Sequence, residues 1–128
     1  MNRPFLCRME DIAPTGAKGV VLGEGEDALD IVVVGKDGAH YAYVNSCPHQ
    51  FVPLETFPDH FLTRDRTYLV CSGHGARFAP DSGKCVSGPC IGERLDRLEI
   101  CEADGALYLA EELSPQEIAR SKRRFRNW

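Results

Sequence analysis

The protein is a chain of 128 residues, a length that suits one domain with a modest core, and its apolar fraction of 43% is within the globular range. Residues 1–114 carry 10 basic and 18 acidic side chains, a formal charge of −8, whereas residues 115–128 carry five basic side chains against one acidic, a formal +4. An acidic body argues against nucleic acid as the main partner, and no apolar run approaches the roughly 20 residues of a membrane span.

The N-terminal stretch "MNRPFLCRMEDIAP" lacks the apolar core of a signal peptide, so we expect a cytoplasmic protein. In a reducing compartment cysteines serve more often as metal ligands or buried thiols than as disulfides. The six cysteines of the chain are therefore candidates for those roles.

Closely spaced turn signals divide the chain into short strands. The first hairpin is predicted over residues 30–45, with strands 31–34 and 39–44 around a turn at 36–38. Residues 67–71 form a further apolar strand. Residues 77–86 place a Pro-Asp-Ser-Gly turn at 80–83 between two short strands, and residues 94–111 form a second hairpin around a turn at 103–105.

The C-terminal segment holds the one persuasive helix start in the sequence. Ser114 is a suitable N-cap, Pro115 suits the first helical position, and Glu117 completes a capping box. We therefore predict an all-β domain over residues 1–113, followed by a short basic helix or tail over residues 114–128. A solvated terminus is the simplest role for that tail, and a docking or regulatory element is the alternative.

Two Cys/His pairs carry the chemistry of the sequence. "CPHQ" contains Cys47 and His49, "CSGHG" contains Cys71 and His74, and 21 residues separate His49 from Cys71. Two such pairs, each at a strand end or turn, indicate a metal site. Zinc would accept two Cys and two His in a tetrahedron, and a [2Fe–2S] cluster would take two Cys on one iron and two His on the other. One Cys and one His in each loop favour the cluster, because each loop can then reach both irons.

The two loops, with an aromatic residue, a Gly turn and Gly88-Pro89 after them, resemble the Rieske iron–sulfur proteins over about residues 18–110. The resemblance implies a sandwich of small antiparallel sheets with a cluster-binding tip at about residues 46–91. It assigns Cys47 and Cys71 to one iron and His49 and His74 to the other, with one [2Fe–2S] cluster per chain. "SGPC" (87–90) is similar to the proline loop that covers the cluster in this family.

The departures from the family pattern indicate its ferredoxin-type, lower-potential branch. The extra loop cysteines of the high-potential proteins are missing, and Ala76 stands where those proteins have a serine. The spacer between the pairs is also longer than in the dioxygenase ferredoxins. Its segment 57–66 is expected to border a partner's contact surface, with packing over the base of the domain as the alternative.

The resemblance implies an electron-transfer component rather than a complete enzyme. As a Rieske ferredoxin the protein would pass one electron from a flavoprotein reductase to a terminal oxygenase, with no membrane or nucleic acid as partner. The alternative is an accessory subunit of a larger oxidoreductase, similar to the small subunit of nitrite reductase. Cys85 and Cys90 are expected to be buried small residues, with a disulfide or redox-sensing thiols as alternatives, and His40 and His60 are expected to be surface residues.

Overall fold

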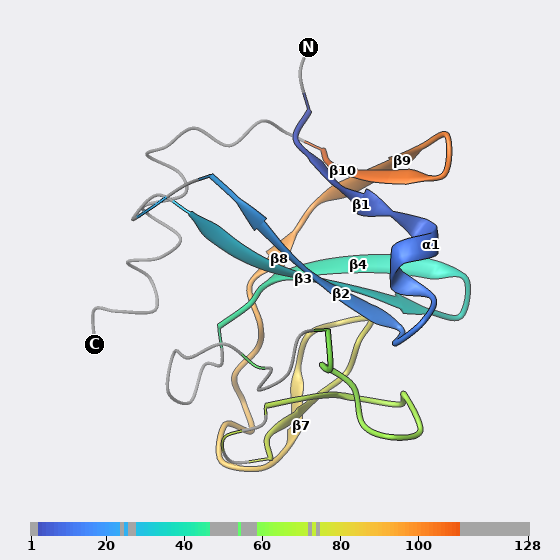
Figure 1. Ribbon diagram of the computed structural model, residues 1–128. Coiled ribbons are helices and arrows are strands. Elements are labelled where there is room, and N and C mark those ends of the chain that lie inside the picture. Colours follow the sequence, from blue (N-terminus) through green and yellow to red (C-terminus); the bar gives the residue numbers. More distant parts are fainter. Residues whose placement is uncertain are drawn as a thin grey trace.

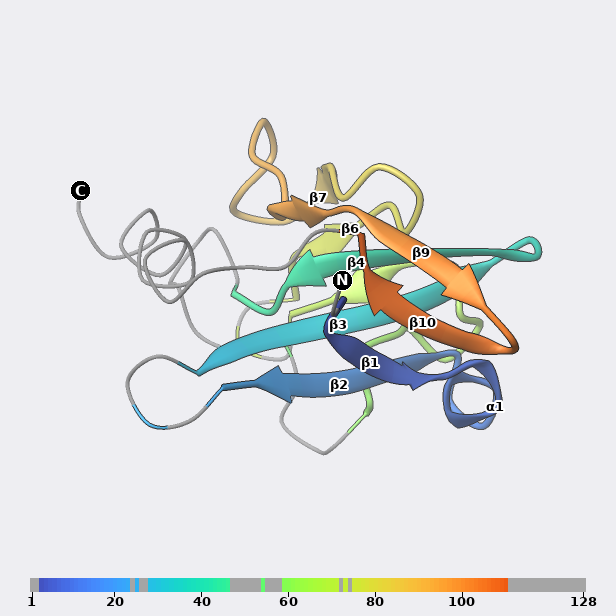
Figure 2. The same ribbon diagram turned by 90° about the horizontal axis from the view of Figure 1, so that it is seen from above.

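The computed structural model describes residues 3–23, 25, 28–46, 54, 59–71, 73 and 75–110. Their strands form three small antiparallel sheets, which lie one above another in Figure 1. In spatial order, the upper sheet contains β1 (Phe5–Arg8), β10 (Ala106–Leu109) and β9 (Ile100–Ala103), the middle sheet β2 (Ala17–Leu22), β3 (Leu29–Lys36), β4 (Ala39–Val44) and β8 (Arg97–Leu98), and the lower sheet β5 (Leu69–Val70), β6 (Arg77–Phe78) and β7 (Cys85–Ser87). Seen from above in Figure 2, β1, β10 and β9 cross over the strands of the middle sheet. The predicted all-β class is confirmed.

Strand β3 is buried on both faces, because alternate side chains of a strand point to opposite sides of its sheet. Val32 and Val34 enter the core that the middle sheet shares with the lower sheet. Ile31 and Val33 enter the second core, which the middle sheet shares with the upper sheet. All four are fully buried, which explains why this strand is a continuous apolar run rather than an alternating one.

The two predicted hairpins are confirmed, and their turns share one backbone conformation. Asp37 and Gly38, between β3 and β4, have φ of 52° and 82°. Asp104 and Gly105, between β9 and β10, have φ of 51° and 76°. Two consecutive positive φ values define the type I′ turn, whose twist matches that of the paired strands, and Asp-Gly is a preferred sequence for it.

Three features near the chain's start and middle differ from the expectations. The apolar run at 67–71 forms a strand only at β5, since Tyr68 donates its backbone N–H to the Thr63 hydroxyl across a turn. Strands β1 and β2 belong to the fold, although no strand was predicted there. A short helix, α1 (Met9–Ile12), also lies next to β1.

Helix α1 has identifiable caps at both ends. At its start, the Arg8 backbone N–H donates to the Asp11 carboxylate over 3.0 Å. At its end, Gly16 adopts a φ of 84° and donates its N–H to the Ile12 carbonyl over 2.7 Å. Ile12 is the buried residue of the helix, so one apolar contact and two local caps hold this single turn.

Tyr43 joins the middle sheet to the lower one. Its hydroxyl donates to the Pro80 carbonyl over 2.6 Å, and burial raises the pKa of Tyr43 to about 12. Gly83 lies against the same ring at a φ of 74°, and a Cβ there would come within 2.7 Å of a ring carbon. The predicted turn at 80–83 is therefore confirmed, and its glycine allows close approach as well as the positive φ.

The described part of the long spacer is bound to the body of the domain. The Asp59 carboxylate accepts the Gly19 backbone N–H over 2.8 Å and pairs with the Lys18 ammonium at 3.1 Å. Phe61 is fully buried in the core below the middle sheet. Arg66 donates to the Ala13 and Pro14 carbonyls just after α1. These contacts favour the packing alternative for residues 59–66, and Phe61 cannot serve as a contact residue for a partner.

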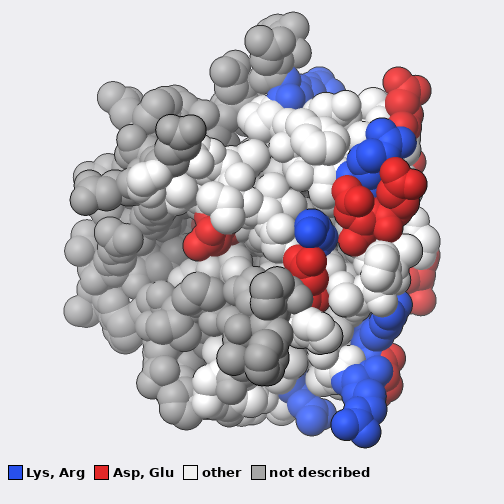
Figure 3. Space-filling view, in the orientation of Figure 1, with Lys and Arg blue, Asp and Glu red and all other residues white. Residues whose placement is uncertain are grey.

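Charged side chains of both signs alternate along one margin of the face shown in Figure 3. The described acidic residues therefore do not gather into a single patch on this face. No helix in the described part of the chain has the length and apolar character needed to span a membrane. The predicted C-terminal helix at 114–128 lies outside the described residues, and the cytoplasmic location stays a prediction.

Asp59 makes acid stability a test of this attachment. Burial acts to raise its pKa, but the Gly19 N–H and the Lys18 ammonium together lower the pKa of the carboxyl below its usual value. A lowered folded-state pKa contributes stability that is present above the unfolded pKa of about 3.9 and is lost as pH falls through the folded pKa.

We expect Asp59→Asn to lower the urea midpoint at pH 7, and the gap from the wild type to close between about pH 5 and pH 3. Asn tolerates the positive φ of 64° at this position and can still accept the Gly19 N–H, so the change isolates the charge. A constant gap at all pH values would contradict the assignment.

Candidate functional site

The second Cys/His pair lies in a tight loop that follows β5. Two backbone hydrogen bonds close this loop: the Cys71 N–H donates to the Ala76 carbonyl over 2.8 Å, and the Gly75 N–H donates to the Cys71 carbonyl over 2.9 Å. Gly75 has a φ of 74°, which favours glycine and agrees with the conformational role expected for it. The loop therefore has a fixed backbone path on both sides of the position of His74.

Cys71 is buried, with 2% of its surface exposed, and belongs to the core below the middle sheet. A Cβ placed on Gly73 would lie 3.8 Å from the Cys71 Sγ, so the loop backbone passes close to this sulfur. A buried thiol beside a glycine-rich loop suits a thiolate ligand, because backbone N–H groups of such a loop can approach inorganic sulfides. The described part of the site thus fits an iron–sulfur cluster.

The loop after β7 packs directly on this ligand loop. Gly88 has a φ of 98°, and a Cβ there would lie 2.8 Å from the Ala76 Cα, closer than real Cβ contacts allow. "SGPC" was expected to resemble the family's proline loop, and its Gly88 does contact the residue that follows the second pair. The contact depends on glycine both for its φ and for the absence of a side chain.

The first pair is bracketed by a buried asparagine. Asn45, directly after β4, accepts the Leu54 backbone N–H on its Oδ1 over 2.8 Å. Its own N–H donates to the Asp30 carbonyl over 2.8 Å, and Leu54 is fully buried. The two ends of the segment that contains Cys47 and His49 are therefore tied to each other and to the middle sheet. Sequence reasoning missed Asn45, although a polar residue directly before the first pair was a signal for it.

Three of the four predicted ligands, Cys47, His49 and His74, lie outside the described residues. Among the residues that are described, no group of three or more His, Cys, Asp or Glu side chains converges on a possible metal position. The structure therefore places Cys71 and the supports of both loops, and the full ligand set stays a prediction.

Cys85 and Cys90 are buried in the same core as Cys71, as expected. The Cys90 thiol donates to the Cys85 Sγ over 3.2 Å, so these cysteines are reduced neighbours and not a disulfide. The residues beside them are apolar but exposed: Val86 is 46% exposed and Ile91 is 68% exposed. His60 is exposed and His40 is half-buried on β4.

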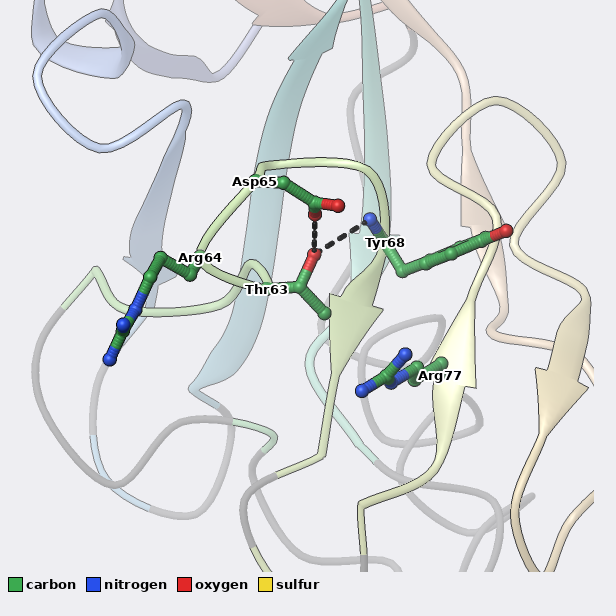
Figure 4. A pocket seen from close by; sticks show the side chains of 5 residues that line it. All are labelled: Thr63, Arg64, Asp65, Tyr68 and Arg77. Carbon is green, nitrogen blue, oxygen red and sulfur yellow. Dashed lines mark hydrogen bonds between the residues drawn. The ribbon is translucent and has the colours of Figure 1, made fainter.

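An open pocket of about 360 Å³ lies beside β5 and β6 (Figure 4). Its lining residues are Thr63, Arg64, Asp65, Tyr68 and Arg77. The Thr63 hydroxyl donates to Asp65 over 2.7 Å, and this bond and the Thr67 N–H lower the pKa of the Asp65 carboxyl. The polar groups of the pocket thus serve the turn at 63–68, and its lining contains no Cys or His ligand.

Gly88 and Gly92 offer a matched test of the contact between the two loops. Their φ values are 98° and 99°, but a Cβ on Gly92 would meet nothing within 4 Å. Alanine at either position should cost about 1–3 kcal/mol for the unfavourable φ. We expect Gly88→Ala to cost roughly 1–3 kcal/mol more, because its methyl group overpacks against Ala76.

Urea unfolding followed by circular dichroism gives the two free energies of unfolding, and bleaching of visible absorption reports on the site. Gly88→Ala should bleach faster than Gly92→Ala. Equal losses in the two variants would show that the loop contact contributes nothing.

A model of the Rieske [2Fe-2S] domain family matches residues 2–107 of the chain. No curated protein matches the sequence. Among solved structures, the Sphingomonas yanoikuyae B1 ferredoxin superimposes with a TM-score of 0.68 at 21% identity, over 87% of this chain and 100% of that one.

The ferredoxin of carbazole 1,9a-dioxygenase from Nocardioides aromaticivorans IC177 superimposes with a TM-score of 0.65 at 15% identity, over 88% and 100% of the two chains. A chain from a complex of reduced oxygenase and oxidized ferredoxin in carbazole 1,9a-dioxygenase gives 0.64 at 23% identity, over 86% and 95%. At these identities the structures show a shared fold. The family match, which spans both Cys/His pairs, shows more: this chain belongs to the Rieske [2Fe-2S] domain family and holds one [2Fe-2S] cluster.

Proposed function

We propose that this protein is a one-electron carrier, with Cys47 and Cys71 on one iron of its cluster and His49 and His74 on the other. The observation that carries the proposal is the family match over residues 2–107, which contains both pairs. The closed loop at 71–76 supports it, because it fixes Cys71 as a buried sulfur beside a glycine-rich backbone. A bound cluster of this type supplies a site that accepts and releases one electron.

The ligand types set how readily the site accepts an electron. Two thiolates and two neutral imidazoles bring two fewer negative charges than four thiolates do. Rieske centres accordingly have reduction potentials of roughly −150 to +300 mV, against about −400 mV for all-cysteine plant-type clusters. The absence of the extra loop cysteines, together with Ala76 in the second loop, places this chain toward the lower part of that range.

The partners proposed for this chain are a flavoprotein reductase as donor and a terminal oxygenase as acceptor. The fold shared with two dioxygenase-associated ferredoxins supports this choice. An accessory role in a larger oxidoreductase is the competing proposal, and a cytoplasmic location is part of the carrier proposal.

The exposed apolar residues of the tip suit docking with such partners. Val86 and Ile91 flank the loop that lies on Ala76, and both are far more exposed than large apolar residues elsewhere in the tip. Exposed apolar side chains surrounded by polar surface are a feature of protein interaction sites. Electron transfer requires close approach, so a contact surface next to the ligand loops meets that need.

Replacement of either imidazole tests the ligand assignment. His49→Cys and His74→Cys each add a negative thiolate, so the reduction potential should fall toward that of all-cysteine clusters. Protein-film voltammetry measures the potential, and the wild type should be red-brown with about two irons and two acid-labile sulfides per chain. A colourless wild type with one zinc ion would contradict the whole assignment, and a potential that rises in both variants would contradict the charge argument.

Replacement of Ile91 tests the docking surface. Ile91→Asp should slow electron transfer to the oxygenase about tenfold or more through weaker association, with visible spectrum and potential unchanged. Val21→Asp is the matched control, because Val21 is 60% exposed on β2 in the middle sheet. The second-order rate constant from stopped-flow mixing is the measurement.

The two variants also separate the competing roles. Equal rates for Ile91→Asp and Val21→Asp would remove the docking surface. A cluster-loaded protein that transfers no electrons and leaves the cell extract only as part of a fixed complex would favour the accessory subunit.

A further inference from the structure

The cysteines at the two ends of the proline loop are close enough to react with each other. Cys85 ends its strand pairing with Phe78 on β6, and Cys90 follows Pro89, so the pair brackets the exposed loop 86–89. Their sulfurs are 3.2 Å apart, about 1.1 Å more than the ~2.05 Å of an S–S bond. Few chance pairs of core cysteines would point their thiols at each other across a loop of this length.

We propose that Cys85 and Cys90 are a reversible dithiol–disulfide pair that staples the proline loop over the second ligand loop. This goes beyond electron transfer by the cluster, because the pair exchanges two electrons with small disulfides and not with the cluster's partners.

Hydrogen bonding assigns the order of the two sulfurs. The Cys85 Sγ accepts the hydrogen bond from the Cys90 thiol, which stabilises a thiolate at Cys85. Cys85 is also the more exposed of the two, at 7% against 3%. It donates in turn to the Ser87 carbonyl over 3.2 Å, a bond that is lost when the thiolate forms. Cys85 is therefore the attacking sulfur and Cys90 the resolving one.

The oxidant is a low-molecular-weight disulfide such as oxidised glutathione. The Cys85 thiolate attacks one of its sulfurs, forming a mixed disulfide and releasing one glutathione thiol. The Cys90 sulfur then attacks the Cys85 sulfur of that mixed disulfide and releases the second glutathione thiol. Two thiol protons and two electrons pass from the protein to glutathione, and one S–S bond replaces another.

Access to the pair is through the exposed loop and not through the core. Val86, Gly88, Pro89 and Ile91 are all exposed, and no large buried side chain separates this loop from solvent. A small displacement of residues 86–89 would uncover both sulfurs while Phe78 and the core behind it stay packed. Closing the disulfide would restrict the same displacement, and with it the Gly88 contact on Ala76.

The sequence offers a direct test, because one tryptic peptide, residues 85–94, contains Cys85 and Cys90 and no other cysteine. The cluster-loaded protein is incubated with oxidised glutathione, alkylated under denaturing conditions, digested and weighed. We expect peptide 85–94 to be unalkylated and lighter by two hydrogens, and to regain two alkylated thiols after dithiothreitol.

Cys101 is the internal comparison. It is half-buried, its Sγ accepts a hydrogen bond from Arg3 at 3.2 Å, and it lies alone in its tryptic peptide. It should form only a glutathione adduct. A glutathione adduct on Cys101 together with two alkylated thiols in peptide 85–94 would overturn the proposal, because the oxidant was active and the pair did not react.

Single-cysteine variants test the order and the staple. In Cys90→Ser, Cys85 should retain one glutathione, since its resolving partner is gone; an unmodified Cys85 would overturn the order of attack. In the wild type, oxidation should slow amide exchange over residues 86–92 about tenfold. It should also slow the loss of visible absorption to a chelator. Both rates should be insensitive to glutathione in Cys90→Ser, and a wild type equally insensitive would overturn the staple.

Discussion

Burial of β3 on both faces is the constraint on which the other elements depend. A strand with Ile31 and Val33 on one face and Val32 and Val34 on the other needs an apolar layer above and below it. Full burial of each side chain contributes about 1.5–3 kcal/mol relative to exposure, so neither layer can be given up. The upper sheet supplies Leu107 and Leu109 to one layer, and the lower sheet supplies Leu69 and Phe78 to the other.

The lower layer explains why the ligand loops have fixed positions although they are loops. Leu69 and Phe78 face each other in the register of β5 and β6, and the loop of the second pair joins these two strands. Cys71 itself lies in that core. On the other side, Leu54 is buried in the same core and Asn45 ties it to the end of β4. Loops anchored at both ends on a packed layer can hold a cluster while their outer residues face a partner.

The sequence predicts the hairpins well because their determinants are local. Asp-Gly at 37–38 and 104–105 specifies the turn, and apolar runs on either side specify the strands. The ligand pairs are also local signals, and the family match spans them. Helix α1 escaped prediction because one turn has too few residues for a periodic pattern, although the acidic residue at Asp11 was a cap signal.

Other features depend on contacts between distant residues and could not be read from the sequence. Nothing near Asp59 indicates that Gly19 and Lys18 will bind it, since 40 residues separate Asp59 from Gly19. The exposure of Ile91 beside a buried Cys90 depends on how the loop folds back on Ala76. The spacing of Cys85 and Cys90 allows several arrangements, and only the structure shows their sulfurs in contact.

The attachment of the spacer has a consequence for how the tip can work. Residues 59–66 bind β2 and the segment after α1, so this part of the insertion lies along the flank of the domain. Its buried Phe61 strengthens the core that also contains Cys71. The proline loop, by contrast, is held to the rest of the tip mainly through glycine contacts and short backbone bonds, and it presents Val86 and Ile91 to solvent. A tip that is rigid on the spacer side and adjustable on the proline-loop side keeps its ligand geometry constant while its contact surface adapts to a donor and then to an acceptor.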